Sequence, residues 1–446
     1  MSTRLSRRQW LATGAAGLAV APLGSSLLWA RPPVKNPRAT DGDDRHEPDW
    51  TQRLTITVGH QGADLNGRDD KVVQAALDYV ARLGGGTVHV RAGKYVFRNA
   101  VQLPSGVRLR GDGADTILTK IPSTTIALAD DSDWYDQEVT LKNAKGFRVG
   151  DGVVLITKNP HNGSQDVIKR TLVAQKGNRF KLSDGIRKNL WLTGKPTCST
   201  MFPLLTSENT ADVVIENLAL DGDKKNNMNL NGNYAGNIFL QDCNRYTIRG
   251  VESREYNGDG ISFQICHDVV VENCYSHDNA NLGVHPGSGS QRPVLLNNRL
   301  ERNTIGIFWC WGVKFGLAEG NRIVGNRNFG ISIGHCDTDN VMRNNEVIDS
   351  GKVGILFRDD PRGRDFWANR NLIENNTVIN SGPSDGIAID VQGQTKDTKI
   401  RNNRLVEKRG QMKRVGLRIA DTAGVVELAD NQFQGFSTDL IDQRKD

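Results

Sequence analysis

The sequence predicts an all-β fold in which short strands from successive repeats stack into a solenoid. The first observation is a phrase of Gly followed by apolar residues, which recurs through the second half of the chain. The second is a polar turn with Asn at its centre, which recurs between these phrases. Self-similarity at a regular period is the signature of a repeat architecture. The phrases begin at Gly260, Gly283, Gly306, Gly330, Gly354 and Gly386, and the turns are centred at Asn273, Asn298, Asn321, Asn345, Asn376 and Asn403.

The repeated phrase has the pattern of a β-strand. Apolar runs of about four residues between Gly, Asn and Asp are too short for helices. In the phrase that begins at Gly260, Ile261 and Phe263 should point inward and Ser262 outward, because side chains alternate along a strand. The same strand in successive repeats would pair in parallel. We expect the turn Asn residues to adopt left-handed conformations and to bond to neighbouring repeats through stacked amides.

A helix is expected before the first repeats. Apolar residues recur at helical spacing through residues 71–83, with Asp69 or Asp70 as the N-cap and residues 84–86, all Gly, as the stop signal. A helix with one apolar face at the start of a solenoid would cap its otherwise open core.

The segments 62–64, 84–88, 92–95 and 109–111 read Gly-Ala-Asp, Gly-Gly-Gly-Thr-Val, Ala-Gly-Lys-Tyr and Leu-Arg-Gly. This series resembles the entry segment of the pectate-lyase-like superfamily of right-handed parallel β-helices. The resemblance covers this entry and the repeats from 211 to about 436. It implies a single-stranded right-handed parallel β-helix with an N-terminal capping helix.

Five segments are expected along the chain. An insertion with strand-like runs interrupts the repeats, and its functional role would be to wall one end of a groove. The segments are a signal peptide (1–30), a linker (31–50), the capping helix and first rungs (51–129), a small β insertion (130–205), and the regular rungs with the C-terminal end (206–446).

The N-terminus carries an export pattern. Arg7 and Arg8 precede an apolar run over residues 12–28, which resembles a twin-arginine signal with cleavage near Ala30. The resemblance implies passage through the twin-arginine translocation machinery and a periplasmic or extracellular location. Gly, Pro and Ser interrupt the apolar run, so it is a poor membrane-spanning helix, and no stable membrane insertion is expected after export.

Charge and cysteine content narrow the function classes. The net charge is +6, and the sequence shows no basic run interleaved with aromatic residues, which argues against a nucleic-acid partner. None of the six cysteines forms a CxxC pair, which argues against a structural zinc site. Cys243 and Cys266 occupy equivalent repeat positions and should stack about 4.8 Å apart. A disulfide is geometrically open to them, and stacked free thiols are the favoured alternative.

Aligning the repeats by their Gly residues places unusual side chains along one outward stripe. This stripe spans about five rungs, or roughly 20–25 Å, which suits a polysaccharide better than a small molecule. We predict His285, His335, Arg358 and Asp359 as catalytic residues, and Trp311, Tyr256, Asp390 and Gln264 as substrate-binding residues.

The predicted residue types suit chemistry on a uronate. Abstracting the proton next to a carboxyl group requires neutralisation of the carboxylate, for which Arg358 is the candidate. It also requires a base, for which His285 or His335 is the candidate. Pectate lyases hold Ca²⁺ with acidic residues, and in this chain Asp337 and Asp339 are the candidates for such a metal site.

The sequence therefore predicts an exported, carbohydrate-active protein that cleaves a uronate-containing polysaccharide by β-elimination. A glycoside hydrolase with two carboxylates, a uronate epimerase and a non-catalytic glycan-binding β-helix are the alternatives. The Asp-Pro-His-Asp motif of mannuronan epimerases is absent, and residues 159–162 read Asn-Pro-His-Asn.

Overall fold

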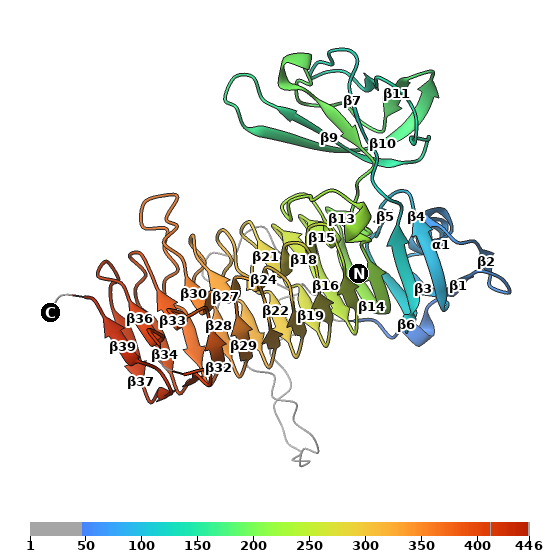
Figure 1. Ribbon diagram of the computed structural model, residues 1–446. Coiled ribbons are helices and arrows are strands. Elements are labelled where there is room, and N and C mark those ends of the chain that lie inside the picture. Colours follow the sequence, from blue (N-terminus) through green and yellow to red (C-terminus); the bar gives the residue numbers. More distant parts are fainter. Residues whose placement is uncertain (1–46, 411, 445–446) are drawn as a thin grey trace, which may run out of the picture. The chain divides into compact units, whose positions relative to one another are not determined.

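The computed structural model describes residues 47–410 and 412–444, all of which belong to one compact unit of the chain. It confirms the right-handed parallel β-helix (Figure 1). The predicted signal peptide (1–30) and most of the linker (31–50) lie outside the described residues. None of the helices within the described residues is long and apolar enough to span a membrane.

The entry segment contains the expected helix. The Asp69 side chain caps α1 by accepting a hydrogen bond from the Lys71 N–H, and Val73, Leu77 and Val80 of α1 are fully buried in the main core. The elements are η2 (Trp50–Gln52), β1 (Thr55–Gly59), β2 (Leu65–Asn66), α1 (Asp70–Arg82), β3 (Gly86–Val90), β4 (Gly93–Phe97), β5 (Val101–Gln102) and β6 (Val107–Lys120).

One face of the solenoid is a parallel sheet of eleven strands, called here the eleven-stranded sheet. Its strands come from successive turns of the chain, so each hydrogen-bonds to the strand one turn earlier and one turn later. In spatial order they are β5, β13 (Leu205–Glu208), β15 (Gly236–Gln241), β18 (Asp259–Gln264), β21 (Leu282–Gly287), β24 (Ile305–Phe308), β27 (Phe329–Ile333), β30 (Val353–Phe357), β33 (Ile387–Val391), β36 (Val415–Ile419) and β39 (Thr438–Asp442).

The remaining faces form two parallel ladders that the long strands β6 and β14 (Ala211–Asp221) join into one sheet. One ladder contains β16 (Asn244–Arg249), β19 (Val270–Glu272), β22 (Val294–Leu296), β25 (Leu317–Glu319), β28 (Val341–Arg343), β31 (Leu372–Glu374), β34 (Thr398–Arg401) and β37 (Val426–Ala429). The other contains β17 (Glu252–Arg254), β20 (Tyr275–His277), β23 (Arg299–Glu301), β26 (Arg322–Val324), β29 (Glu346–Ser350), β32 (Thr377–Ser381), β35 (Arg404–Val406) and β38 (Gln432–Gln434).

The predicted alternation of side chains is confirmed. Ile261 and Phe263 are fully buried in the main core, together with the equivalent Ile307, Ile331 and Ile355 of later turns. Each turn therefore adds apolar residues to one continuous column, which is how a solenoid buries a core without a globular shape.

The stacked Asn residues form the expected ladder. Asn345 illustrates it, because its Nδ2 donates to Oδ1 of Asn376 at 2.9 Å while its Oδ1 accepts from Nδ2 of Asn321 at 2.9 Å. Two details of the prediction were wrong. The left-handed residue is the one before each ladder position, for example Asn344. Asn273 also has a positive φ, and Cys274 takes the ladder position in its turn.

The insertion is a six-stranded antiparallel sheet. Its core contains Leu155 and Phe180. Strand β9 begins at Gly152, directly after a turn in which the Asp151 carboxylate accepts the Arg148 N–H. Its elements are β7 (Thr125–Ala127), β8 (Glu138–Thr140), β9 (Gly152–Lys158), β10 (Gln165–Lys176), β11 (Arg179–Leu182), η3 (Leu192–Gly194) and β12 (Thr197–Ser199), and η4 (Lys224–Asn226) follows in the first regular rung.

The cysteines are present as free thiols. Cys243 and Cys266 stack on neighbouring turns as predicted, and the Cys243 N–H donates to the Cys266 sulfur at 3.4 Å. Both side chains are buried in the main core.

Candidate functional site

The strand register decides which outward side chains are neighbours. Ser262 pairs with His285, and Phe308 pairs with Ser332, which pairs with Leu356. Because Val284 pairs with Ile307, His285 and Phe308 also lie side by side. These residues form one outward row on the eleven-stranded sheet.

The predicted position of Asp390 needs a correction. Alignment by Gly386 placed Asp390 in the row of Arg358, but Ile355 pairs with Ile389 and Leu356 pairs with Asp390. Asp390 therefore lies in the row of His285, two residues earlier than expected. Its carboxylate is buried and accepts two hydrogen bonds from Arg418, at 2.9 and 2.6 Å.

His285 is a buried residue held by Asp259. Its Nδ1 lies 2.7 Å from Oδ2 of Asp259, and its Nε2 has no hydrogen-bond partner. Burial lowers the pKa of His285, but the neighbouring Asp259 and Cys310 outweigh burial and raise the pKa to about 9. Asp259 is fully buried, and its second oxygen accepts the Leu282 N–H at 3.1 Å. At neutral pH His285 is therefore protonated.

Hydrogen bonds hold the Arg358 side chain beside the same outward row, next to Phe308. Its Nη1 donates to Oγ of Ser332 at 2.8 Å, and its Nη2 donates to the Trp309 carbonyl at 3.0 Å. Its guanidinium carbon lies 4.4 Å from the ring centre of Phe308. Gly334 makes room for this position, because a Cβ there would lie 2.4 Å from Nη2 of Arg358.

Phe308 and Cys310 lie between the two cations. The Phe308 ring contacts His285 edge to face at 5.3 Å between centroids. Cys310 pairs with Gly287 in the next row, and it is half-buried while His285 is only 3 % exposed. The thiol of Cys310 lies close enough to both His285 and Arg358 to affect the pKa of each. A partly exposed thiol flanked by cations is the setting in which reactive cysteines are found.

Gln264 covers the row next to His285. Its Nε2 donates to Oγ of Ser262 at 3.1 Å, and its Oε1 is buried without a hydrogen-bond partner. The side chain occupies the space that a Cβ on Gly287 would need. Gln264 therefore belongs to the predicted stripe.

His335 and Trp311 form a separate aromatic group at the end of the strands. The His335 ring contacts Trp311 at 5.5 Å and Phe366 at 5.4 Å, each edge to face. Trp311 is 48 % exposed and Phe366 is 46 % exposed, and Arg362 stacks on Trp311 at 4.8 Å. The exposed rings suit stacking on a sugar, whereas the buried His335 supports them from behind.

Tyr256 and Asp359, two further predicted residues, differ in their exposure. Tyr256 is fully buried, donates its hydroxyl to the Phe202 carbonyl at 2.9 Å and packs in a small apolar cluster with Met201 and Leu230. Asp359 is exposed next to Arg358.

The predicted metal ligands Asp337 and Asp339 pair with different arginines, and Oδ2 of Asp337 lies 3.6 Å from Nη2 of Arg358. Asp337 is buried and accepts the N–H groups of Gly312, Val313 and Gly334, each at 2.9 Å. Asp339 instead accepts two hydrogen bonds from Arg370, at 2.8 Å each. Among residues 47–410 and 412–444, no group of three or more His, Cys, Asp or Glu side chains is arranged to hold a metal ion.

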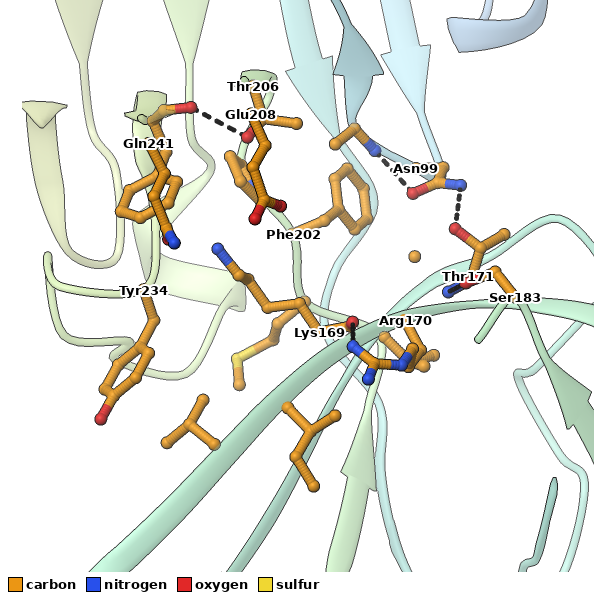
Figure 2. A pocket seen from close by; sticks show the side chains of 18 of the residues that line it. Asn99, Lys169, Arg170, Thr171, Ser183, Phe202, Thr206, Glu208, Tyr234 and Gln241 are labelled. Carbon is orange, nitrogen blue, oxygen red and sulfur yellow. Dashed lines mark hydrogen bonds between the residues drawn. The ribbon is translucent and has the colours of Figure 1, made fainter. Parts of the chain in front are cut away.

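A cavity of about 500 Å³ continues the site toward the N-terminal end of the eleven-stranded sheet (Figure 2). It is lined by strands β5, β13 and β15 and by the insertion. Phe239 and Gln241 of β15 pair with Ser262 and Gln264 of β18, so the cavity lies in the same two rows as His285 and Arg358. Lys169 of the insertion reaches into it, with Nζ 3.9 Å from the ring centre of Phe239.

Sequence reasoning missed several residues of this site. Asp259 looked like a turn residue because it precedes a repeat Gly, and only the pairing of β18 with β21 reveals its contact with His285. Phe308 and Cys310 follow Gly306 by two and four residues. Alignment of the repeats by their Gly residues therefore placed them on the same outward stripe as His285, and this could have identified them. Lys169 had no such signal, because it belongs to the insertion and not to a repeat.

The comparisons with known proteins agree with the fold. A family model described as a right-handed β-helix region matches residues 218–363. A search of curated protein sequences found no significant match. The structure is similar to the A-modules of two Azotobacter vinelandii mannuronan C-5 epimerases. For AlgE6 the TM-score is 0.55 at 15% identity, covering 83% of this chain and 91% of that one. For AlgE4 the TM-score is 0.51 at 15% identity, covering 87% and 100%. Identity at this level shows a shared right-handed parallel β-helix fold.

Proposed function

We propose that the protein is exported and cleaves a uronate-containing polysaccharide that lies along the eleven-stranded sheet. The observation that carries this proposal is the convergence of His285 and Arg358 on Phe308, with the Cys310 thiol between them. Two fixed positive charges beside a partly exposed thiol suit a reaction that removes a proton next to a carboxylate. The two structural neighbours named mannuronan C-5 epimerases act, by their names, at carbon 5 of a polyuronate. These neighbours show only that the fold is shared, and the proposal itself rests on the residues of the present protein.

Arg358 neutralises the substrate carboxylate in this proposal. Two of its guanidinium nitrogens donate to Ser332 and to the Trp309 carbonyl, which fixes its orientation before the substrate binds. Negative charge that develops on the carboxylate when the neighbouring carbon loses its proton is then stabilised by a preorganised cation. A lysine could not reproduce the planar arrangement of donors.

Cys310 is the base in this proposal, and His285 positions it. In this proposal His285 is protonated at neutral pH and its Nε2 is buried, so Cys310 takes the role of base that the sequence assigned to His285 or His335. In this proposal Cys310 acts as a thiolate, and its sulfur takes the proton from carbon 5 of the uronate. The electron pair forms the double bond between carbons 4 and 5, the bond from carbon 4 to the glycosidic oxygen breaks, and the leaving oxygen takes a proton from water. The hydroxide that remains takes the proton from Cys310 and restores the thiolate.

Asp259 and Asp390 do not suit hydrolysis. A hydrolase needs two carboxylates that flank the bond, one of them free to protonate the leaving group. Asp390 is saturated by Arg418, and Asp259 is buried against His285. Elimination needs only one neutralised carboxylate and one base, and we assign these roles to Arg358 and Cys310.

The test incubates the mature protein with alginate, pectate and glycosaminoglycans in D₂O. An increase in the ultraviolet absorbance of unsaturated products supports elimination. Reducing ends without that absorbance would indicate hydrolysis, and deuterium at carbon 5 without chain cleavage would indicate epimerisation. Binding without any of the three would leave a non-catalytic glycan-binding protein. For export, replacing Arg7 and Arg8 by Lys should retain the precursor in the cytoplasm.

A further inference from the structure

The cavity between the insertion and the eleven-stranded sheet has the dimensions of a sugar-binding pocket. Its volume of about 500 Å³ lies within the range of small-molecule sites. Phe202, Phe239 and Tyr234 contribute aromatic surface to its lining, and Thr171 and Gln241 contribute polar groups (Figure 2). Aromatic rings beside hydroxyl and amide groups are suited to the apolar face and the hydroxyl groups of a sugar.

Lys169 supplies a positive charge inside this cavity. Its amine lies over the Phe239 ring and points toward Glu208 and Gln241 (Figure 2). Burial lowers the pKa of Lys169 to about 8, and the charge of Glu208 opposes that effect. Within residues 47–410 and 412–444, no carboxylate lies within ion-pair distance of Lys169. Its charge is therefore available to an acidic ligand at neutral pH.

The wall of the cavity is firmly attached to the solenoid. Arg98 donates two hydrogen bonds to the buried carboxylate of Asp151, at 2.6 and 2.8 Å. Asn99 donates to the Thr171 hydroxyl at 3.0 Å. These contacts hold the insertion over β5, β13 and β15, which are the first strands of the eleven-stranded sheet. A polysaccharide that lies along the outward rows would therefore meet the insertion at the β5 end of the eleven-stranded sheet.

We propose that this cavity binds the end of an acidic polysaccharide chain and that Lys169 binds the acidic group of the terminal sugar. The inference rests on the proposed function for the class of ligand. Phe239 on β15 and Phe308 on β24 lie in the same row, three strand spacings apart, which is roughly 14 Å. Cleavage beside Cys310 with the chain end in the cavity would release short fragments of one length from that end.

The first experiment follows product size during cleavage of end-labelled oligouronates. Short fragments of a single length from the earliest times are expected. A broad distribution of sizes at early times would overturn the chain-end proposal while leaving the proposed cleavage intact.

The second experiment uses calorimetry to measure how tightly the protein binds galacturonate and mannuronate, each as a monomer, a dimer and a trimer. Replacing Lys169 by Met should weaken binding at least about tenfold, because a charge-assisted hydrogen bond is lost. Lys181→Met is the matched control, since Lys181 is exposed on the same insertion and does not line the cavity. Wild-type binding should also fall as the pH rises through about 8, because Lys169 loses its charge there.

The two proposals fail in different ways. Equal binding by wild type and Lys169→Met would overturn the role of Lys169, whatever the catalytic result. Binding that depends on Lys169 without cleavage of any polysaccharide would support the cavity and reject the proposed elimination.

Discussion

Oδ2 of Asp259 lies 2.7 Å from Nδ1 of His285, although 26 residues separate them in the chain. The contact joins β18 to β21 and uses one carboxylate oxygen, while the other oxygen accepts the Leu282 N–H at 3.1 Å. Ser262 completes the surroundings, with Oγ 3.4 Å from the same ring nitrogen. A buried carboxylate is thus satisfied by a strand N–H and by an imidazolium.

Replacing Asp259 by Asn should lower the pKa of His285. In the wild type the alkaline limb of the pH–rate profile is expected near pH 9, where His285 loses its proton. The Asn variant keeps the shape but removes the negative charge, so the limb should move by one pH unit or more toward neutrality. An unchanged limb in the variant would show that His285 does not control the rate.

The same pair should make stability depend on pH. The folded pKa of His285 is about 9, above its value of about 6.5 in the unfolded chain. Its contribution, about 3 kcal/mol, is therefore complete below pH 6.5 and is lost as the pH rises through 9. Urea unfolding of wild type and His285→Gln at pH 6 and pH 10 measures it. The two proteins should differ more at pH 6, and a pH-independent difference would contradict the charge assignment.

Replacing Cys310 by Ala should reduce the rate of elimination by at least about a hundredfold, because a positioned base contributes that much. Iodoacetamide should inactivate the wild type, and an oligouronate substrate should protect it. Cys198 and Cys274 are buried, so they serve as internal controls that remain unlabelled in the folded protein. Full activity in Cys310→Ala would assign the base elsewhere.

Replacing Arg358 by Lys should lower kcat more than it changes KM, because the neutralised charge develops in the transition state. Lys keeps the charge but loses the second donor that fixes the guanidinium between Ser332 and the Trp309 carbonyl. Steady-state kinetics on the polysaccharide that the wild type cleaves would measure both constants. A rise in KM with kcat unchanged would indicate that Arg358 only binds substrate.

Replacing Gly232 by Ala should destabilise the fold. A Cβ on Gly232 would lie 1.6 Å from Oδ2 of Asp259, so either the loop or the Asp259–His285 pair must move. Overpacking of this kind costs about 1–3 kcal/mol. Thermal unfolding measures the loss, and an unaltered melting temperature would show that the loop adjusts without strain.

The periodic part of the molecule could be read from the sequence because each repeat obeys the same local rules. Ile261 and Phe263 point inward wherever the phrase forms a strand, and the Asn residues stack because the turns stack. The prediction failed where the register slipped, as at Asp390. Gly386 resembles the other repeat glycines, but hydrogen bonding aligns β33 two residues further along.

The sequence by itself determined the coil of short parallel strands, the capping helix and the stripe that holds His285, Gln264 and Arg358. These features follow from side-chain alternation and repeat length, which are local properties of the chain. Only the tertiary structure decided that Asp259 raises the pKa of His285, that Cys310 lies between two cations, and that Lys169 reaches over Phe239. Those contacts depend on strand register and on the docking of the insertion, which involve segments far apart in the chain.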